Sequence, residues 1–334
     1  MRVLIVKLSS LGDVVHALPV VHDIRVALPL AHIDWVVEPG FAPLVQRVDG
    51  VDRTIACALR RWRRAWWTAE VRTEWRTFRA ELRRERYDAV LDLQGLTKSV
   101  LIARLARCAP GGARFGLANR PDGAGWEPPA RWFTDRALCV EPHLHALDTS
   151  RALAAQALGY EISGPPVFGL RSNAAPVSVR TIVFVHGTSR DDKLWPEVHW
   201  TELARRFIAE GWRVALPEGN DAEAARARRL AAAIGAEHCE VWPRMDLHAL
   251  VDRMVATQGV IGVDSGLSHI AVALGLAHVQ VYNFPTAWRT GPHDAHGHRH
   301  QVSVGGGPAP RADAVWAAWQ QAWAARRAAG SERP

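Results

Sequence analysis

The sequence predicts an α/β protein of two domains, each built on a parallel sheet covered by helices. Strand-like apolar runs alternate with helical patterns, and the alternation begins anew after a proline-rich segment near the middle of the chain. A length of 334 residues is sufficient for two domains with separate cores. We therefore expect domains at residues 1–164 and 179–310, a linker at 165–178 and a C-terminal helix at 311–334.

In the first half, aliphatic and β-branched runs predict strands at residues 3–6, 33–37, 53–57 and 87–93. Helical patterns follow, including those at 98–105 and 145–158, whereas the Gly/Pro-rich segment 109–129 predicts a loop. In the second half, the expected strands are 181–185, 213–216, 239–242, 259–263 and 278–282. The expected helices are 198–208, 222–234, 247–255, 267–274 and 312–329.

The composition is that of a soluble protein, with 48% hydrophobic and 22% charged residues. No run of about 18 apolar residues and no signal-peptide pattern is present, so we expect a cytoplasmic protein. The four cysteines are widely spaced and predict no zinc site. A net charge of +7 indicates acidic partners, namely phosphates, nucleic acid or an anionic membrane surface.

The first predicted strand runs into a polar loop that ends on Asp13. Ligands of open α/β sheets bind at the carboxyl ends of the strands, so this loop is a candidate binding edge. Asp13 has two interpretations, an N-cap of the following helix or a general base. The loop carries neither a dinucleotide-binding glycine fingerprint nor a P-loop.

Two strand ends in the second half predict a nucleotide-diphosphate site. Thr188, Ser189 and Lys193 follow one strand, where hydroxyls, a cation and helix N–H groups suit an anion, although an ordinary capped turn is the alternative. The segment 262–269 spans the end of another strand, and its Asp264 either caps a helix, orients a donor group or faces a ribose. A role for Ser265 as a nucleophile is disfavoured because the sequence around it lacks the Gly-x-Ser-x-Gly motif of the nucleophile elbow. The chain also lacks an Asp-x-Asp element that could hold a diphosphate through a metal ion.

Arginines and tryptophans are interleaved in the segment 60–67. Planar guanidinium groups bind phosphates and carboxylates in bidentate fashion, which favours an acidic acceptor over a merely solvated helix face. Four histidines at 293, 296, 298 and 300 resemble a histidine-rich metal-binding segment. The pattern of this segment predicts a loop without regular structure to fix the histidines, so we expect no metal there.

The chain resembles the lipopolysaccharide heptosyltransferases of glycosyltransferase family 9, and in particular the type I enzymes, over nearly its whole length. The resemblance is carried by six segments: 6–13, 35–38, 60–64, 87–90 with 94–96, 190–196 and 263–269. It implies a GT-B fold, in which two Rossmann-like α/β domains face each other across a cleft. It also implies inverting transfer of L-glycero-D-manno-heptose from ADP-heptose to the inner Kdo of Kdo2-lipid A, without a tightly bound cofactor or metal.

The resemblance assigns Asp13 the role of catalytic base. It places donor contacts at Thr188, Ser189, Lys193, Glu223, Met245, Asp264, Ser265, Gly266, Leu267 and His269. It associates the anionic acceptor with Arg60, Arg61, Arg63, Arg64 and Arg120. Because the acceptor is a lipid, it also implies peripheral attachment to the anionic cytoplasmic face of the inner membrane.

Departures from the family pattern occur in the donor half. The segment 283–292 differs from the usual motif, so no contact can be transferred there; serine replaces threonine at 189 and 265, and Glu218 replaces an aromatic residue. Two alternatives remain: a heptosyltransferase that adds the second or third heptose, and a nucleic-acid-binding protein that uses the Arg/Trp surface. No nucleic-acid-binding motif supports the latter, so we expect no nucleic-acid partner.

Overall fold

The computed structural model describes residues 1–172, 174, 179–292 and 299–331. The chain forms two compact units, Met1–Arg171 and Ser172–Pro334. The division falls within the segment 165–178 that the sequence indicates as a linker. Part of that segment belongs to the first unit, because Leu170 forms an antiparallel bridge with Val48.

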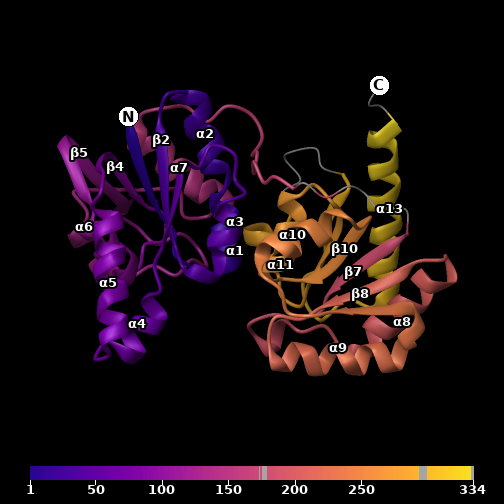
Figure 1. The fold of residues 1–334 in the computed structure, drawn as a ribbon. Helices are drawn as coiled ribbons and strands as arrows, with labels where there is room; N and C mark the ends of the chain where they lie inside the picture. Colours follow the sequence, from indigo (N-terminus) through magenta and orange to yellow (C-terminus); the bar gives the residue numbers. More distant parts are fainter. Residues whose placement is uncertain (173, 175–178, 293–298, 332–334) are drawn as a thin grey trace. The chain divides into compact units, whose positions relative to one another are not determined.

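The first unit is a six-stranded parallel sheet in the order β3-β2-β1-β4-β5-β6. Figure 1 labels its strands β2, β4 and β5. Its strands are β1 (Arg2–Val6), β2 (His32–Val37), β3 (Arg53–Ala56), β4 (Arg86–Asp92), β5 (Arg107–Leu117) and β6 (Arg136–Leu138). Its α-helices are α1 (Leu11–Ala17), α2 (Pro19–Ala27), α3 (Ala42–Val45), α4 (Leu59–Ala65), α5 (Ala69–Leu82), α6 (Thr97–Leu105) and α7 (Ala146–Leu158).

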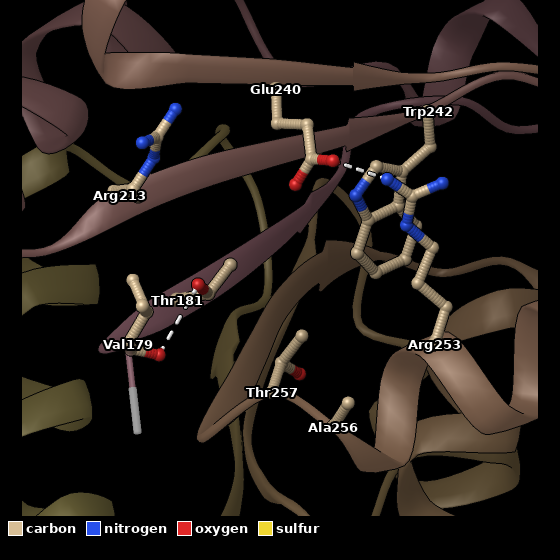
Figure 2. Close-up of a pocket in the computed structure, with 8 residues that line it drawn as sticks. All are labelled: Val179, Thr181, Arg213, Glu240, Trp242, Arg253, Ala256 and Thr257. Carbon is tan, nitrogen blue, oxygen red and sulfur yellow. Dashed lines mark hydrogen bonds and ion pairs between the residues drawn. The ribbon is translucent and has the colours of Figure 1, made fainter. Parts of the chain in front are cut away.

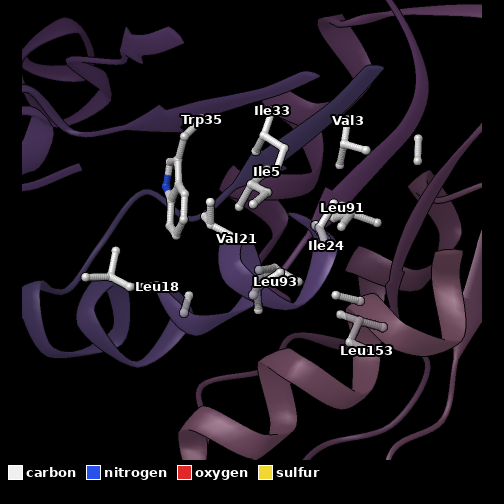
Figure 3. Packing of buried hydrophobic residues seen from close by; sticks show 14 of the residues in the cluster. Val3, Ile5, Leu18, Val21, Ile24, Ile33, Trp35, Leu91, Leu93 and Leu153 are labelled. Atoms are coloured by element: carbon white, nitrogen blue, oxygen red, sulfur yellow. The ribbon is translucent and has the colours of Figure 1, made fainter. Parts of the chain in front are cut away.

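Both faces of this sheet are buried, as its continuous apolar strands predict. On one face, Val3 and Ile5 of β1 pack with Val21 and Ile24 of α2 and Leu153 of α7 (Figure 3). On the other face, Leu4 and Val6 join a second cluster with Trp62, Phe78 and Ile102 from α4, α5 and α6. Successive residues of β1 therefore supply two separate cores.

The second unit repeats the plan, with the parallel order β12-β11-β10-β7-β8-β9. Its strands are β7 (Thr181–Val185), β8 (Arg213–Pro217), β9 (Cys239–Trp242), β10 (Gly259–Val263), β11 (Ala277–Tyr282) and β12 (Gln301–Gly305). Its α-helices are α8 (Glu197–Ala209), α9 (Asp221–Ile234), α10 (Leu247–Val255), α11 (Gly266–Ala273), α12 (Ala287–Thr290) and α13 (Ala312–Ser331).

The C-terminal helix α13 is part of the second unit. Figure 1 shows it running alongside the second sheet, and its Ala312, Val315 and Trp319 lie in the same buried cluster as Val279 of β11. Phe207 of α8 packs edge-to-face on Trp319, with ring centroids 5.3 Å apart. Aromatic packing thus joins α8, α13 and the sheet.

The prediction of a loop over 109–129 is wrong at its start, since β5 extends to Leu117. The Gly/Pro-rich residues form an irregularity in the pairing of β4 with β5, between Tyr87 and Ala89. A side chain on Gly112 would lie 2.5 Å from the carbonyl oxygen of Tyr87, so the backbones approach closely there. The strand then regains regular pairing, with Phe115 and Leu117 buried.

Two short strands, β6 and β12, escape the sequence prediction, and both are edge strands of their sheets. Only Gln301 of β12 is buried, so this strand lacks the apolar run on which the prediction depends. None of the described helices is long and apolar enough to cross a bilayer.

We predict that Gly259→Ala destabilises the second unit by about 1–3 kcal/mol, because overpacking of a well-filled core costs this much. The new Cβ would lie 2.4 Å from the indole of Trp319 and 2.8 Å from the carbonyl oxygen of Ala277. Urea unfolding followed by circular dichroism measures the effect. Gly40→Ala is the control, because nothing lies within 4 Å of its Cβ position, and an equal change in both variants would contradict the prediction.

Candidate active site

The strand order reverses once in each sheet, beside β1 in the first and beside β7 in the second. In parallel sheets the loops at the carboxyl ends of the two strands at such a point diverge and leave a crevice, which is the usual place for a ligand. The loops after β1 and β4 lie at this point in the first unit. Those after β7 and β10 lie at it in the second.

Asp13 lies in the first turn of α1, directly after β1. Its Oδ2 atom accepts hydrogen bonds from the backbone N–H of Ser10 at 2.9 Å and from the Ser10 hydroxyl at 2.7 Å. Ser10 is the N-cap residue and Asp13 is the third helical residue, so Asp13 closes a capping box and is not itself the N-cap. The cap fixes the carboxylate at the carboxyl edge of the sheet.

Buried polar contacts tie the loop after β1 to the loop after β4. The Nζ atom of Lys7 donates to the carbonyl of Leu93 at 2.7 Å, and the side chain of Gln94 accepts from the N–H of Leu8 at 2.8 Å. Sequence reasoning missed Lys7 and Gln94 as individual residues, although a lysine directly after a buried strand is a usable signal. Burial raises the pKa of the neighbouring Asp92 to about 6.

The arginine-rich segment forms α4, which follows β3 at the same edge. Trp62 is buried and packs the helix against the sheet. The four arginines of α4 that the sequence analysis names are all exposed. Arg61 pairs with Glu74 of α5. Arg60, Arg63 and Arg64 form no ion pair with any residue that the structure describes, and so remain available to an anion.

Arg120 and Glu38 lie on other loops of this edge. Arg120 is exposed after β5, and its Nε atom donates to the carbonyl of Ala124 at 3.3 Å. Glu38 follows β2, and its carboxylate accepts from the N–H of Arg60 at 3.4 Å. Burial raises the pKa of Glu38, against the opposing effect of Arg60. The five arginines that the sequence analysis associates with the acceptor therefore come from helix α4 and from the loop after β5, at one edge of the sheet.

The second unit centres on Asp264, which follows β10 and is 8% exposed. Its Oδ2 atom lies 2.5 Å from Nζ of Lys193, and its Oδ1 atom lies 3.3 Å from Nε2 of the buried His269. Burial alone would raise the pKa of Asp264, but His269 and Lys193 together hold it well below its usual range. Capping of α11 by Asp264 is excluded, because Ser265 is the N-cap residue.

Further polar groups surround this cluster. Thr188 after β7 donates to the carbonyl of Asp264 at 3.1 Å, which joins the two predicted loops. Thr290 of α12 lies 3.4 Å from Oδ1 of Asp264, and the amide of Asn283 donates to the carbonyls of Asp192 and Leu194 on either side of Lys193. Sequence reasoning missed Asn283 and Thr290, because their segment departs from the family pattern.

Glu223 lies at the same carboxyl edge, where its side chain packs against the loops after β7 and β8. Its carboxylate accepts from the N–H of Gly219 at 2.8 Å. A side chain on Gly187 would lie 2.5 Å from the Glu223 carboxyl carbon, so glycine at 187 admits Glu223 beside the β7 loop. Met245 lies in the loop between β9 and α10.

The remaining predicted donor residues lie in the two loops themselves. Gly266 and Leu267 begin α11, whose N–H groups point toward the carboxyl edge of the sheet. The Ser265 hydroxyl is buried and has no hydrogen-bond partner in the described ranges. Ser189 is exposed in the loop after β7. An unpartnered hydroxyl beside a helix N-terminus and a cation is suited to an anionic ligand.

A pocket of about 360 Å³ lies at the opposite edge of the second sheet (Figure 2). It is lined by Thr181 and Arg213, which begin β7 and β8, and by Glu240, which pairs with Arg253 of α10. The Arg253 guanidinium lies over the Trp242 ring, 4.8 Å from its centroid. Because this pocket is at the amino ends of the strands, it is separate from the candidate site.

Residues 75–306 match the family model described as glycosyltransferase family 9 (heptosyltransferase). The chain belongs to glycosyltransferase family 9. It is 41% identical over 290 residues to lipopolysaccharide heptosyltransferase 1 of Escherichia coli K12, a match that covers 84% of this chain and 88% of the relative. Lipopolysaccharide heptosyltransferase 2 of Salmonella typhimurium is 27% identical over 298 residues, covering 84% of this chain and 82% of that protein.

Solved structures agree with this assignment. The E. coli heptosyltransferase WaaC with ADP superimposes with a TM-score of 0.81 at 35% identity, and the match covers 100% of both chains. The predicted fold class is therefore confirmed: the family 9 chain is a glycosyltransferase with two Rossmann-like α/β domains of the GT-B class. The 41% identity to the E. coli type 1 relative, against 27% to the type 2 relative, favours a heptosyltransferase of type 1 over a later-acting one.

No group of three or more His, Cys, Asp or Glu side chains gathers as metal ligands in the described part of this glycosyltransferase. Of the predicted histidine tract, residues 293, 296 and 298 lie outside the described residues.

We predict that Asp264→Asn destabilises this glycosyltransferase most above about pH 4. The folded pKa of Asp264 is depressed, so its ion pairs stabilise the fold above the unfolded pKa of about 3.9 and are lost as the pH falls toward the lower folded pKa. Urea midpoints of wild type and variant should therefore converge with acidification. Asp221→Asn, at a fully exposed carboxylate, is the control; a pH-independent difference for Asp264→Asn would contradict the prediction.

Proposed function

We propose that the enzyme transfers L-glycero-D-manno-heptose from ADP-heptose to the inner Kdo of Kdo2-lipid A, with inversion at the anomeric carbon. The observation that carries the proposal is the cluster of Lys193, Asp264 and His269 beside the N-terminus of α11. The 41% identity to a type 1 relative supports the choice of heptose position, and the ADP in the similar solved structure supports the donor.

The donor half assists departure of ADP. As the glycosidic bond to the diphosphate breaks, negative charge grows on the leaving oxygens, and preorganised donors stabilise it. Lys193 contributes the full charge, the first N–H groups of α11 contribute the helix dipole, and the Ser265 hydroxyl contributes a donor without a competing partner. Pairing with Asp264 keeps the flexible Lys193 side chain directed at this edge before the donor arrives.

The Asp13 carboxylate acts as the general base. A sugar hydroxyl is a poor nucleophile, so a carboxylate within hydrogen-bond reach must take its proton during the displacement. The two hydrogen bonds from Ser10 to Oδ2 hold the carboxylate in one orientation. A single displacement requires no covalent enzyme intermediate, so one base is sufficient for an inverting reaction.

The exposed arginines of α4 and Arg120 bind the anionic acceptor. Kdo carries a carboxylate and lipid A carries phosphates, and guanidinium groups match both in bidentate geometry. Trp66 and Trp67 follow α4 and are 68% and 61% exposed. Tryptophan and arginine at one surface suit the interface of an anionic bilayer, so we propose peripheral attachment to the cytoplasmic face of the inner membrane. A nucleic-acid role is disfavoured by the family membership.

Asp13→Asn is expected to lower kcat by about 10²–10⁴-fold, which is the usual contribution of general-base catalysis. Asparagine retains an oxygen that can accept from Ser10, so the cap is conserved while the base is lost. Heptose transfer from ADP-heptose to Kdo2-lipid A, followed by ADP release, measures kcat, and calorimetry with ADP should give an unchanged affinity.

Two controls accompany this variant. Ser10→Ala removes one hydrogen bond to Asp13 and keeps its charge, so it should retain most of the turnover. Lys193→Ala should weaken ADP binding, in contrast to Asp13→Asn. Near-normal turnover by Asp13→Asn would remove Asp13 from the mechanism, and transfer to an already heptosylated acceptor alone would assign the enzyme to a later step.

The double variant Trp66→Ser/Trp67→Ser is expected to reduce co-flotation of the enzyme with vesicles that contain anionic lipid several-fold, because interfacial indoles and neighbouring arginines act together. Trp288→Ser, at an indole residue 40% exposed in the second unit, should float like wild type. Wild-type protein that does not float with anionic vesicles would refute membrane attachment.

A further inference from the structure

A pocket of about 610 Å³ opens in the first unit between α4, α5 and α6. This volume lies within the range of about 300–1,000 Å³ that is typical of small-molecule sites. Its walls are largely apolar and comprise Leu59, Trp75, Leu101, Ile102 and Leu105. Leu101 is 45% exposed, so an apolar wall is open to solvent, whereas Trp62 and Phe78 fill the core on this face of the sheet.

Cations stand at the rim of this pocket. Arg63 of α4 and Lys98 of α6 line it, and neither forms an ion pair with a residue of the described ranges. Arg104, further along α6, is paired with Asp135 at 3.1 Å. The acidic residue at the rim is Glu127, whose carboxylate accepts a hydrogen bond from the N–H of Thr97 at 2.8 Å. This bond keeps the carboxylate at the start of α6.

The pocket extends from the edge of the sheet where the acceptor is proposed to bind. Helix α6 begins at Thr97, four residues beyond Leu93 in the loop that Lys7 holds beside the Asp13 loop. Lys98 is close enough to Glu38, at the same edge, to lower its pKa against the effect of burial. Leu101, Ile102 and Leu105 then follow at helical spacing along α6, away from that edge. Lys98 thus lies at the end of α6 nearest that edge, and Leu105 lies at its far end beside the paired Arg104.

We propose that this pocket binds one alkyl chain of the acceptor, an anionic glycolipid, while Arg63 and Lys98 contact a phosphate or carboxylate of its head group; this inference rests on the proposed function. A cationic rim over an apolar groove is complementary to an amphiphile with an anionic head, and it does not suit a neutral chain or a polar sugar alone. Withdrawal of a chain from water at the enzyme surface would also orient the sugar end toward Asp13.

The test measures the affinity of hexyl, octyl and decyl phosphate by calorimetry below their critical micelle concentrations. Each buried methylene contributes about 0.8 kcal/mol, so wild-type affinity should rise by up to roughly fourfold for every methylene added. Leu101→Glu places a carboxylate in the groove, and Leu101→Trp fills it; both should reduce the rise to below about twofold per methylene. Leu30→Glu is the matched control, at a leucine that is 88% exposed outside the pocket, and should retain the wild-type rise.

Two outcomes would contradict the proposal that the pocket binds an alkyl chain. Wild-type affinity that is independent of chain length means that no alkyl chain is bound. An equal rise in wild type, both Leu101 variants and Leu30→Glu means that the chain, or a partner of another kind, is bound elsewhere. Failure of the proposed function is separate, because it is seen as absent heptose transfer by wild type to a deacylated, water-soluble acceptor, which requires no alkyl site.

Discussion

The arrangement of every site residue depends on one constraint, the parallel pairing of strands on both sides of β1 and of β7. Because all strands of a sheet run in the same direction, every loop that leaves a carboxyl end arrives at one edge. Residues as distant in sequence as Asp13 and Arg120, or Thr188 and Asp264, are thereby brought to a common edge of their own unit. The buried aliphatic strands supply the rigidity, and the loops supply the chemistry.

Within the second unit, electrostatic balance follows from this geometry. A carboxylate as buried as Asp264 is costly unless it is paired, and it has both Lys193 and His269 as partners. The same pairing holds the cation at the carboxyl edge of the sheet, where we propose that the diphosphate binds. A donor phosphate that contacts Lys193 would therefore share it with Asp264, and Thr290 and Asn283 would keep the carboxylate and the lysine loop in place.

Much of this organisation is present in the sequence, because buried parallel strands consist of apolar runs that need no tertiary information to recognise. The strand ends at Val6, Val185 and Val263 were predicted in this way, and with them the loops that carry Asp13, Lys193 and Asp264. Position in the chain does not reveal side-chain pairing: the contact of Lys193 with Asp264 joins residues 71 positions apart. The edge strand β12 was missed because pairing with β11, rather than burial, defines it.

The local role of Asp13 illustrates the same limit. The sequence places an acid near a helix start, but only the backbone conformation decides that Ser10 is the cap and Asp13 its reciprocal partner. The pocket beside α6 was likewise hidden, because its walls come from three helices that are separated in the sequence. Packing of this kind arises from tertiary contacts and not from periodicity.

The aromatic packing around α13 has an optical consequence. The indoles of Trp319 and Trp323 are stacked, with ring centroids 5.7 Å apart and an interplanar angle of 12°. Trp212 packs edge-to-face on both of them. Chromophores at such short and fixed separations couple their electronic transitions and give a circular dichroism signal that isolated indoles lack. The ellipticity of these indoles would thus act as an intrinsic spectroscopic label for the docking of α13, without any added dye.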